Sequence, residues 1–210
     1  KGHGDFKNPI NYRFLFDHSK IFKILDRFIT LDILKNLELT NSFPDRNIYI
    51  NTLDKSFKKN IREESFNIIK ENKNIILLDI KKAFPSIDWY FINVKLKKIL
   101  VKKFGFEIGE NIFQRYMFLI ANRKFYYNKK NVNILKGLPT GLSSSTLIFT
   151  LIFEDIFNEL SDILEENNIF LNKDYELKIF VDDIAIKILN LEKTKIIYLY
   201  LSKILNYYGY

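Results

Sequence analysis

The chain has 210 residues, 47% of them hydrophobic and 16% aromatic, which is enough to bury the core of one domain. Its 33 Lys and Arg against 25 Asp and Glu give a net charge of +8, which favours polyanionic partners such as nucleic acid or an anionic membrane surface. The chain has no cysteine, which excludes disulfides and thiolate metal sites, and its two histidines argue against a zinc site or a histidine-based triad. Catalysis would therefore rest on carboxylates, hydroxyls, backbone groups and a bound metal.

No targeting or membrane-spanning segment is predicted. The strongest apolar stretch, 147–153, is far shorter than a membrane span and ends at Glu154 and Asp155. We therefore expect no membrane partner. Because the chain does not begin with Met, we interpret it as a fragment or a processed piece.

In the first part of the chain, helices and extended segments are predicted to alternate. Apolar residues recur at three- and four-residue steps over 18–39, which predicts an amphipathic helix, and a second helix is predicted at 53–71 after an extended piece at 47–52. The run 75–80 is apolar without polar alternation, so we expect a central strand that is buried on both faces and delivers Asp79 at its end. Next come a turn at 81–86 and helices at 88–103 and 111–121. The apolar positions that define the first helix are Ile21, Ile24, Leu25, Phe28, Leu31 and Leu34.

Two hairpins frame a long helix in the second part of the chain. Aromatic and β-branched arms at 124–127 and 132–135 surround an Asn/Lys turn, which is typical of a hairpin. Glycines and a proline at 137–141 then precede a long apolar helix at 146–165, and Ser143–Ser145 are suited to cap it. A second hairpin, with arms at 177–181 and 184–189, and a helix at 192–205 complete the chain. This order predicts an α+β fold with helices packed on one face of a largely antiparallel sheet.

Three carboxylates stand where predicted strands end. Asp182 and Asp183 lie in the turn of the second hairpin, and Asp79 ends the predicted central strand. Taken alone, an Asp pair at a strand junction is compatible with a solvated turn. If the two strands are neighbours, however, the carboxylates face one another, and a cation would stabilise charges held so close. Mg²⁺ prefers such ligands, and two metal ions can promote an in-line phosphoryl displacement.

Three segments of the chain resemble motifs A, B and C of reverse transcriptases. They are 79–87 (DIKKAFPSI), 137–141 (GLPTG, followed by serines) and 180–183 (FVDD), and they occur in the order that the family shows. The likeness is to the branch that contains group II intron, retron and non-LTR enzymes. It implies a polymerase palm with partial helical fingers. We expect 1–45 to be an N-terminal helical segment with part of the fingers, and 46–210 to be fingers and palm that end before the thumb.

The resemblance implies a metal site. Asp79 and Asp182 would be the catalytic metal ligands, with Asp183 as a supporting carboxylate and the carbonyl of Ile80 as a further ligand. The ions would be two Mg²⁺, for which Mn²⁺ could substitute. Phe180 and Val181 complete motif C.

The resemblance also implies how substrates are held. Phe84, five residues after Asp79, matches the aromatic residue that excludes a ribose 2′-hydroxyl, and the nucleotide would meet Pro139, Thr140 and Gly141. The family commonly has Gln where Thr140 stands. Without the motif, Phe84 is equally an aromatic residue of the core, and the glycines are equally loop residues before a helix.

The function that these motifs predict is RNA-directed DNA polymerase, a nucleotidyltransferase that adds dNTPs to a primer 3′-hydroxyl. Its partners would be an RNA template, a DNA or RNA primer and dNTPs. One alternative within the same fold is an RNA-dependent RNA polymerase. Another is a catalytically idle palm that serves as an RNA-binding or splicing scaffold, as in a maturase.

Overall fold

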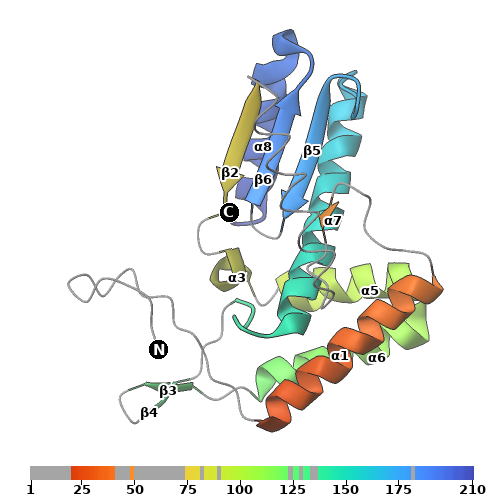
Figure 1. Cartoon of the computed structure of the whole chain (residues 1–210), viewed down its shortest axis with the longest axis vertical. Helices are drawn as coiled ribbons and strands as arrows, with labels where there is room; N and C mark the ends of the chain where they lie inside the picture. Colours follow the sequence, from red (N-terminus) through yellow and green to blue (C-terminus); the bar gives the residue numbers. More distant parts are fainter. Residues whose placement is uncertain are drawn as a thin grey trace, which may run out of the picture.

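The computed structural model describes residues 20–40, 48–49, 74–80, 83–88, 91–122, 125–127, 130–132, 137–180 and 183–210. These residues form a mixed α+β fold, with helices on one face of a small sheet and a group of helices at one end of it (Figure 1). In the described part of the chain, no helix combines the length and the hydrophobicity that crossing a membrane requires. The predicted α+β class is confirmed.

The elements follow one another in a simple order. The helices are α1 (Lys20–Leu39), α3 (Ala83–Ser86), the π-helical η2 (Ile92–Leu96), α5 (Lys97–Phe104), α6 (Phe106–Ala121), α7 (Ser143–Glu166), the 3₁₀ turn η3 (Leu191–Lys193) and α8 (Thr194–Tyr207). The strands are β1 (Ile48–Tyr49), β2 (Ile75–Asp79), β3 (Phe125–Tyr127), β4 (Lys130–Val132), β5 (Tyr175–Phe180) and β6 (Asp183–Ile188).

The main sheet has the strand order β1-β5-β6-β2 and is antiparallel except for the parallel pair β1–β5. In β6 the side chains alternate: Ile184, Ile186 and Ile188 are buried, whereas Asp183 is exposed. This period of two means that one face of the sheet packs on helices. The other, the polar face, carries charged residues such as Glu176, Lys187 and Asp183. Helices α7 and α8 contact each other and lie together behind the sheet in Figure 1.

Helix α7 is the central element of the core. Most of its apolar side chains are buried, and the rings of Phe149 and Phe153 stack with their centroids 4.3 Å apart. A helix that is apolar on most sides has to be surrounded by other elements, and α7 contacts α1, α5 and α8. Helices α5 and α6 pack closely where Gly109 lies: a Cβ atom on this residue would be only 2.5 Å from the carbonyl oxygen of Leu100, so a side chain there would not fit.

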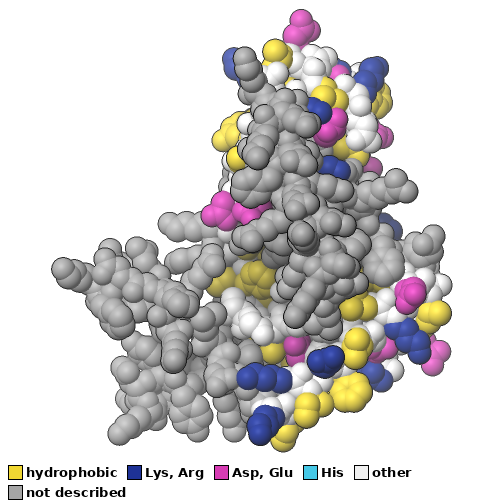
Figure 2. Space-filling view, in the orientation of Figure 1, with side chains coloured by type: hydrophobic (Ala, Val, Ile, Leu, Met, Phe, Trp, Pro, Cys, Tyr) yellow, Lys and Arg dark blue, Asp and Glu magenta, His cyan; other side chains and the backbone are white. Residues whose placement is uncertain are grey.

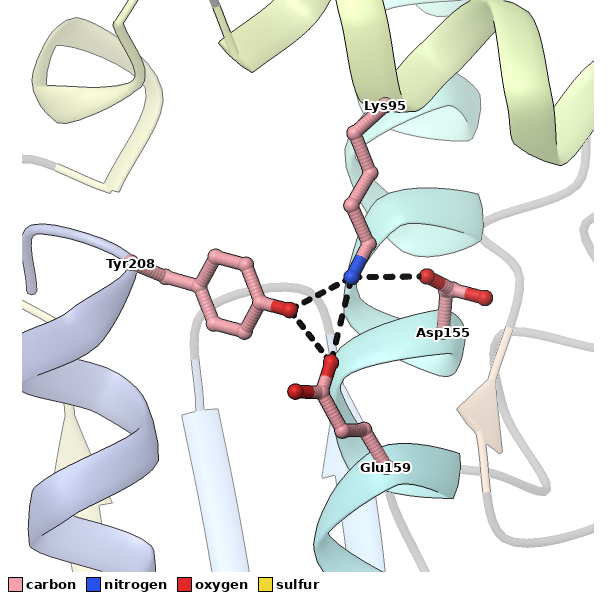
Figure 3. Close-up of polar contacts among 4 residues, drawn as sticks. All are labelled: Lys95, Asp155, Glu159 and Tyr208. Carbon is pink, nitrogen blue, oxygen red and sulfur yellow. Dashed lines mark hydrogen bonds and ion pairs between the residues drawn. The ribbon is translucent and has the colours of Figure 1, made fainter.

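A charge cluster beside this core joins η2, α7 and Tyr208, the residue that follows α8 (Figure 3). The ammonium of Lys95 on η2 lies 3.0 Å from a carboxylate oxygen of Asp155 and 3.2 Å from one of Glu159, both on α7, and donates to the hydroxyl of Tyr208. That hydroxyl donates in turn to Glu159. Burial acts to lower the pKa of Lys95, but the hydrogen bonds to Tyr208 and Asp155 and the carboxylate charge outweigh it, so this pKa is raised. The cluster fastens the segment after α8 to α7.

The amphipathic helix predicted at 18–39 is confirmed as α1, but only part of its predicted apolar face packs on the core, through Leu25 and Leu34. Ile21, Ile24 and Phe28 are 70%, 55% and 67% exposed. The buried side chains are instead Asp26, Ile29, Thr30, Ile33, Asn36 and Leu37. Figure 2 shows basic and hydrophobic side chains mixed along the outer surface of this helix. The polar members of its buried face have partners in the fold, as described for Asp26 below.

The prediction that 75–80 is buried on both faces is also wrong. Strand β2 is the last strand in the sheet order, and Leu77 is 57% exposed. The run is apolar because Ile76 and Leu78 pack against the core, and Ile80 beyond the strand is buried. Ile76, Leu78 and Ile80 therefore serve the core, whereas Leu77 lies on the opposite face of the strand, the one that carries Asp79.

Other predictions differ in their boundaries. The predicted turn at 81–86 contains the short helix α3, the helix predicted from 111 begins at Phe106, and the one predicted from 146 begins at Ser143. The first hairpin is confirmed as the pair β3–β4, with its second arm at Lys130–Val132, and the second hairpin is confirmed as β5–β6. For the helix predicted at 88–103, the described residues are helical from 91 on and include the π-helical turn η2. The last helix is confirmed as η3 and α8. The helix predicted at 53–71 lies outside the described residues.

Candidate active site

Two of the predicted acidic residues lie opposite each other. In the antiparallel pair β2–β6, Asp79 is the register partner of Asp183. Directly opposed residues point to the same face of a sheet, and their Cα atoms are typically about 4.5–5.5 Å apart. Both residues are exposed. The two strands are thus neighbours, as the site requires, and they bring two carboxylates to one end of the polar face.

The remaining motif C residues directly precede Asp183 in the chain. Strand β5 ends at Phe180, whose backbone is in register with Asp183. Val181 and Asp182 lie outside the described residues. Within the described residues, no group of three or more His, Cys, Asp and Glu side chains could hold a metal ion. Asp79 and Asp183 nevertheless fit a hard divalent cation, because they supply carboxylate oxygens from one face of the sheet.

Directly after Asp79, Ile80 is linked to the start of α3 by a backbone hydrogen bond. The carbonyl oxygen of Ile80 accepts a hydrogen bond from the amide of Ala83 (3.1 Å), which leads into α3. A carbonyl oxygen has two lone pairs, so this bond leaves Ile80 able to serve as a ligand. Both Ile80 and Ala83 are buried, which anchors this segment to the core.

Phe84 is half-buried and is held by an aromatic neighbour. Its ring stacks on that of Phe149 of α7, with centroids 4.8 Å apart and an angle of 15° between the ring planes. Phe149 stacks in turn on Phe153. Phe84 is therefore packed against the core, as the simpler interpretation expected, and it also lies close in sequence to the acidic end of β2.

The glycine-rich loop docks onto α3. The amide of Gly137 donates to the carbonyl of Ile87 (2.9 Å), and the amide of Leu138 donates to that of Phe84 (2.8 Å). Gly137 has a φ of +81°, and a Cβ atom there would lie 2.5 Å from the Cα atom of Pro85. Only glycine satisfies both conditions. Motifs A and B, some 50 residues apart in the chain, are thereby joined through their backbones.

The three residues predicted to meet a nucleotide differ in exposure. Pro139 is buried, Thr140 is half-buried and Gly141 is exposed, with a φ of +89°. Leu142 is buried again and is the N-cap residue of α7. The loop therefore reaches the surface at Thr140 and Gly141.

A residue that sequence reasoning missed holds the far end of this loop. The carboxylate of Asp26 on α1 accepts hydrogen bonds from the amides of Ser143 and Ser144, both at 2.9 Å, and from the hydroxyl of Ser144. The serines predicted to cap α7 do not cap it, since the N-cap residue is Leu142 and it forms no side-chain cap. The sequence signal that could have pointed to Asp26 is that it is a carboxylate in a predicted helix and directly follows Leu25, one of the apolar positions of that helix.

The chain matches a protein-family model described as "Reverse transcriptase (RNA-dependent DNA polymerase)" over residues 6–210. A comparison with curated protein sequences gave no significant match.

Two telomerases are among the similar solved structures. Apo telomerase from Candida tropicalis, truncated from its C-terminal domain, is 15% identical over 89% of this chain and 38% of its own, with a TM-score of 0.45. Telomerase from Candida albicans, in complex with the TWJ fragment of telomeric RNA, is 14% identical over 89% of this chain and 33% of its own, with a TM-score of 0.49. This chain thus spans only about a third of the length of either telomerase chain. Because the family model covers nearly the whole sequence, the chain belongs to the reverse transcriptase family.

Proposed function

We propose that this chain is the fingers and palm of an RNA-directed DNA polymerase, which adds dNTPs to the 3′-hydroxyl of a primer on an RNA template. The observation that carries the proposal is the pairing of Asp79 with Asp183 across β2 and β6. Two exposed carboxylates on one rung repel each other, which is unfavourable for a sheet. This arrangement is useful where a divalent cation is to be bound.

The proposed metal ligands are Asp79, Asp182 and the carbonyl of Ile80, with Asp183 as a supporting carboxylate. Two Mg²⁺ ions, or Mn²⁺ in their place, would when bound lower the charge barrier at the attacking 3′-hydroxyl and at the leaving phosphate oxygen. The protein contributes by holding its carboxylates in position before the metal ions bind. Asp79 and Asp183 are held by the hydrogen-bonded register of β2 and β6, so little ordering is left for the moment of binding.

Phe84 is proposed to select the sugar. A ring that excludes a 2′-hydroxyl must keep its position when the nucleotide binds. The ring of Phe84 is restrained on one side by its stack on Phe149. The carbonyl of the same residue is tied to Leu138. These two restraints support Phe84 as a rigid wall that admits deoxynucleotides.

The loop is proposed to contact the nucleotide or the template through its exposed part. Gly141 has no side chain, so backbone groups there can approach a ligand closely, and Thr140 offers a hydroxyl. Pro139 contributes by shaping the loop, since it is buried. The net charge of +8 favours binding of the RNA template and of a DNA or RNA primer.

We further propose that the chain belongs to the branch of group II intron, retron and non-LTR enzymes, on the strength of its motifs. Residues 1–45 would then be a helical segment of the fingers, and 46–210 the fingers and palm.

Primer extension by the natural full-length protein tests the proposed function. Asp182→Asn should abolish Mg²⁺-dependent extension with dNTPs while leaving the protein folded. Extension at an undiminished rate would refute the assignment.

A further inference from the structure

Asp26 is a buried carboxylate whose partners are two backbone amides and a hydroxyl. It is 7% exposed, and its contacts Ser143 and Ser144 lie 117 and 118 residues away in the chain. One carboxylate oxygen accepts from Ser143, and the other accepts from the amide and hydroxyl of Ser144. Both oxygens are thus used, which offsets the cost of taking this charge out of water.

The contacts meet a specific need of α7. The first amides of a helix have no partner within it, and its N-terminus carries a partial positive charge. A side chain at the N-cap position usually supplies the acceptor, but Leu142 cannot. Asp26 therefore supplies from α1 the cap that the sequence around α7 lacks.

This cap lies at one end of the glycine-rich loop. The other end is held by Gly137 and Leu138, whose amides donate to carbonyls of the segment after Asp79. Only four residues, Pro139 to Leu142, separate the two anchors. With both ends fixed and so few residues between them, the positions of Thr140 and Gly141 depend directly on where α7 begins.

We propose that Asp26 is a positioning residue for nucleotide binding: by capping α7 it holds Thr140 and Gly141 where the incoming nucleotide meets them. The inference rests on the proposed function, because it takes the exposed part of this loop as the nucleotide contact. Asp26 does not itself touch the substrate. It acts through the first turn of α7.

The test compares Asp26→Asn and Asp26→Ala in the full-length protein. Asn retains one oxygen acceptor and is a good capping residue, whereas Ala retains none. The control is Asp32→Asn, on the same helix, because Asp32 pairs with Arg115 of α6 (3.1 Å) and not with α7. Two quantities are measured: amide hydrogen exchange of 137–146 without substrates, and KM for dNTP and kcat in primer extension.

We expect faster exchange of 137–146 in both Asp26 variants, and a KM for dNTP that rises on the order of tenfold in Asp26→Ala. Asp26→Asn should fall between Asp26→Ala and wild type, kcat should change far less than KM, and Asp32→Asn should resemble wild type. Unchanged exchange would overturn the proposal. So would faster exchange with an unchanged KM, or a loss of kcat that only follows the folded fraction. An inactive wild-type protein would instead contradict the proposed function, and exchange alone would then decide whether Asp26 holds the loop.

Discussion

Asp79 and Asp183 face each other across one rung of the antiparallel pair β2–β6, at the end of the sheet's polar face. Like charges placed directly opposite each other destabilise a sheet. A divalent cation bound between them would convert this repulsion into attraction. The stability of the folded protein should therefore respond to Mg²⁺ through these two residues.

Mg²⁺ should raise the melting temperature of the wild-type protein, by roughly 2–5 °C at concentrations well above the dissociation constant. In Asp79→Asn the increase should be largely lost, while the melting temperature without metal should equal or slightly exceed that of wild type because the repulsion is gone. The measurement is thermal unfolding by circular dichroism across a Mg²⁺ titration. Asp162→Asn, which alters an exposed carboxylate on α7, is the control. An equal Mg²⁺ effect in all three proteins would argue against metal binding at this pair.

Gly137→Ala should destabilise the protein strongly and reduce primer extension. The added Cβ atom would meet Pro85 at 2.5 Å, and the positive φ adds strain, for a total of roughly 2–4 kcal/mol. Gly209→Ala is the matched control, since its φ is +85° and nothing lies within 4 Å of the added atom. That control should cost about 1 kcal/mol. Chemical denaturation measures both, and equal losses would mean that the loop does not need its close approach to α3.

Phe84→Ala should let the enzyme incorporate ribonucleotides. Removing the ring opens the space that a 2′-hydroxyl would occupy, and it also costs stability because the stack on Phe149 is lost. Competition between a dNTP and the matching rNTP in primer extension measures the choice of sugar. Phe91→Ala is the control, because it removes another half-buried ring, which packs on Tyr208. If sugar choice is unchanged in Phe84→Ala, Phe84 is only a core residue.

Acid should remove the stabilising effect of Asp174. Its carboxylate accepts a hydrogen bond from the amide of Phe170 (2.9 Å) and also contacts Asn190 and Lys193. These contacts, that of Phe170 foremost, lower the pKa of Asp174 below its ordinary value of 3.8. A lowered pKa means that the group stabilises the fold above the ordinary value and stops doing so as the pH falls through the folded-state pKa.

Wild type should therefore be more stable than Asp174→Asn by a constant margin near neutral pH, and the margin should shrink once the pH falls below 3.8. Melting temperatures over a pH series measure this margin. A margin that does not change with pH would show that the charge of Asp174 contributes nothing.

The sequence predicted those parts of the site that depend on local patterns. Two apolar runs on either side of an acidic turn located the β5–β6 hairpin, and an apolar run ending in Asp79 located β2. The order of three motifs then linked segments far apart in the chain. The site required the strands that carry Asp79 and Asp183 to be neighbours, and in the structure β2 and β6 are paired.

Features that depend on contacts between distant segments were not predicted. The periodicity of α1 placed Ile21 and Phe28 on its apolar face, but both are exposed, and the helix instead turns Asp26 inward, where it accepts hydrogen bonds from the start of α7. From the sequence alone, Gly137 is equally an ordinary loop residue before a helix. The need for glycine at this position becomes clear only from the close approach of Pro85. No local pattern carries such information, since each partner lies some 50 residues or more away.

Primer extension tests the central claim most directly. The full-length protein, an RNA template with an annealed primer, dNTPs and Mg²⁺ are combined, and wild type is compared with Asp79→Asn, Asp182→Asn and the control Asp162→Asn. We predict that wild type and Asp162→Asn extend the primer, and that each of the other two variants is slower by at least roughly a hundredfold while remaining folded. Extension by Asp79→Asn or Asp182→Asn at the wild-type rate would contradict the account.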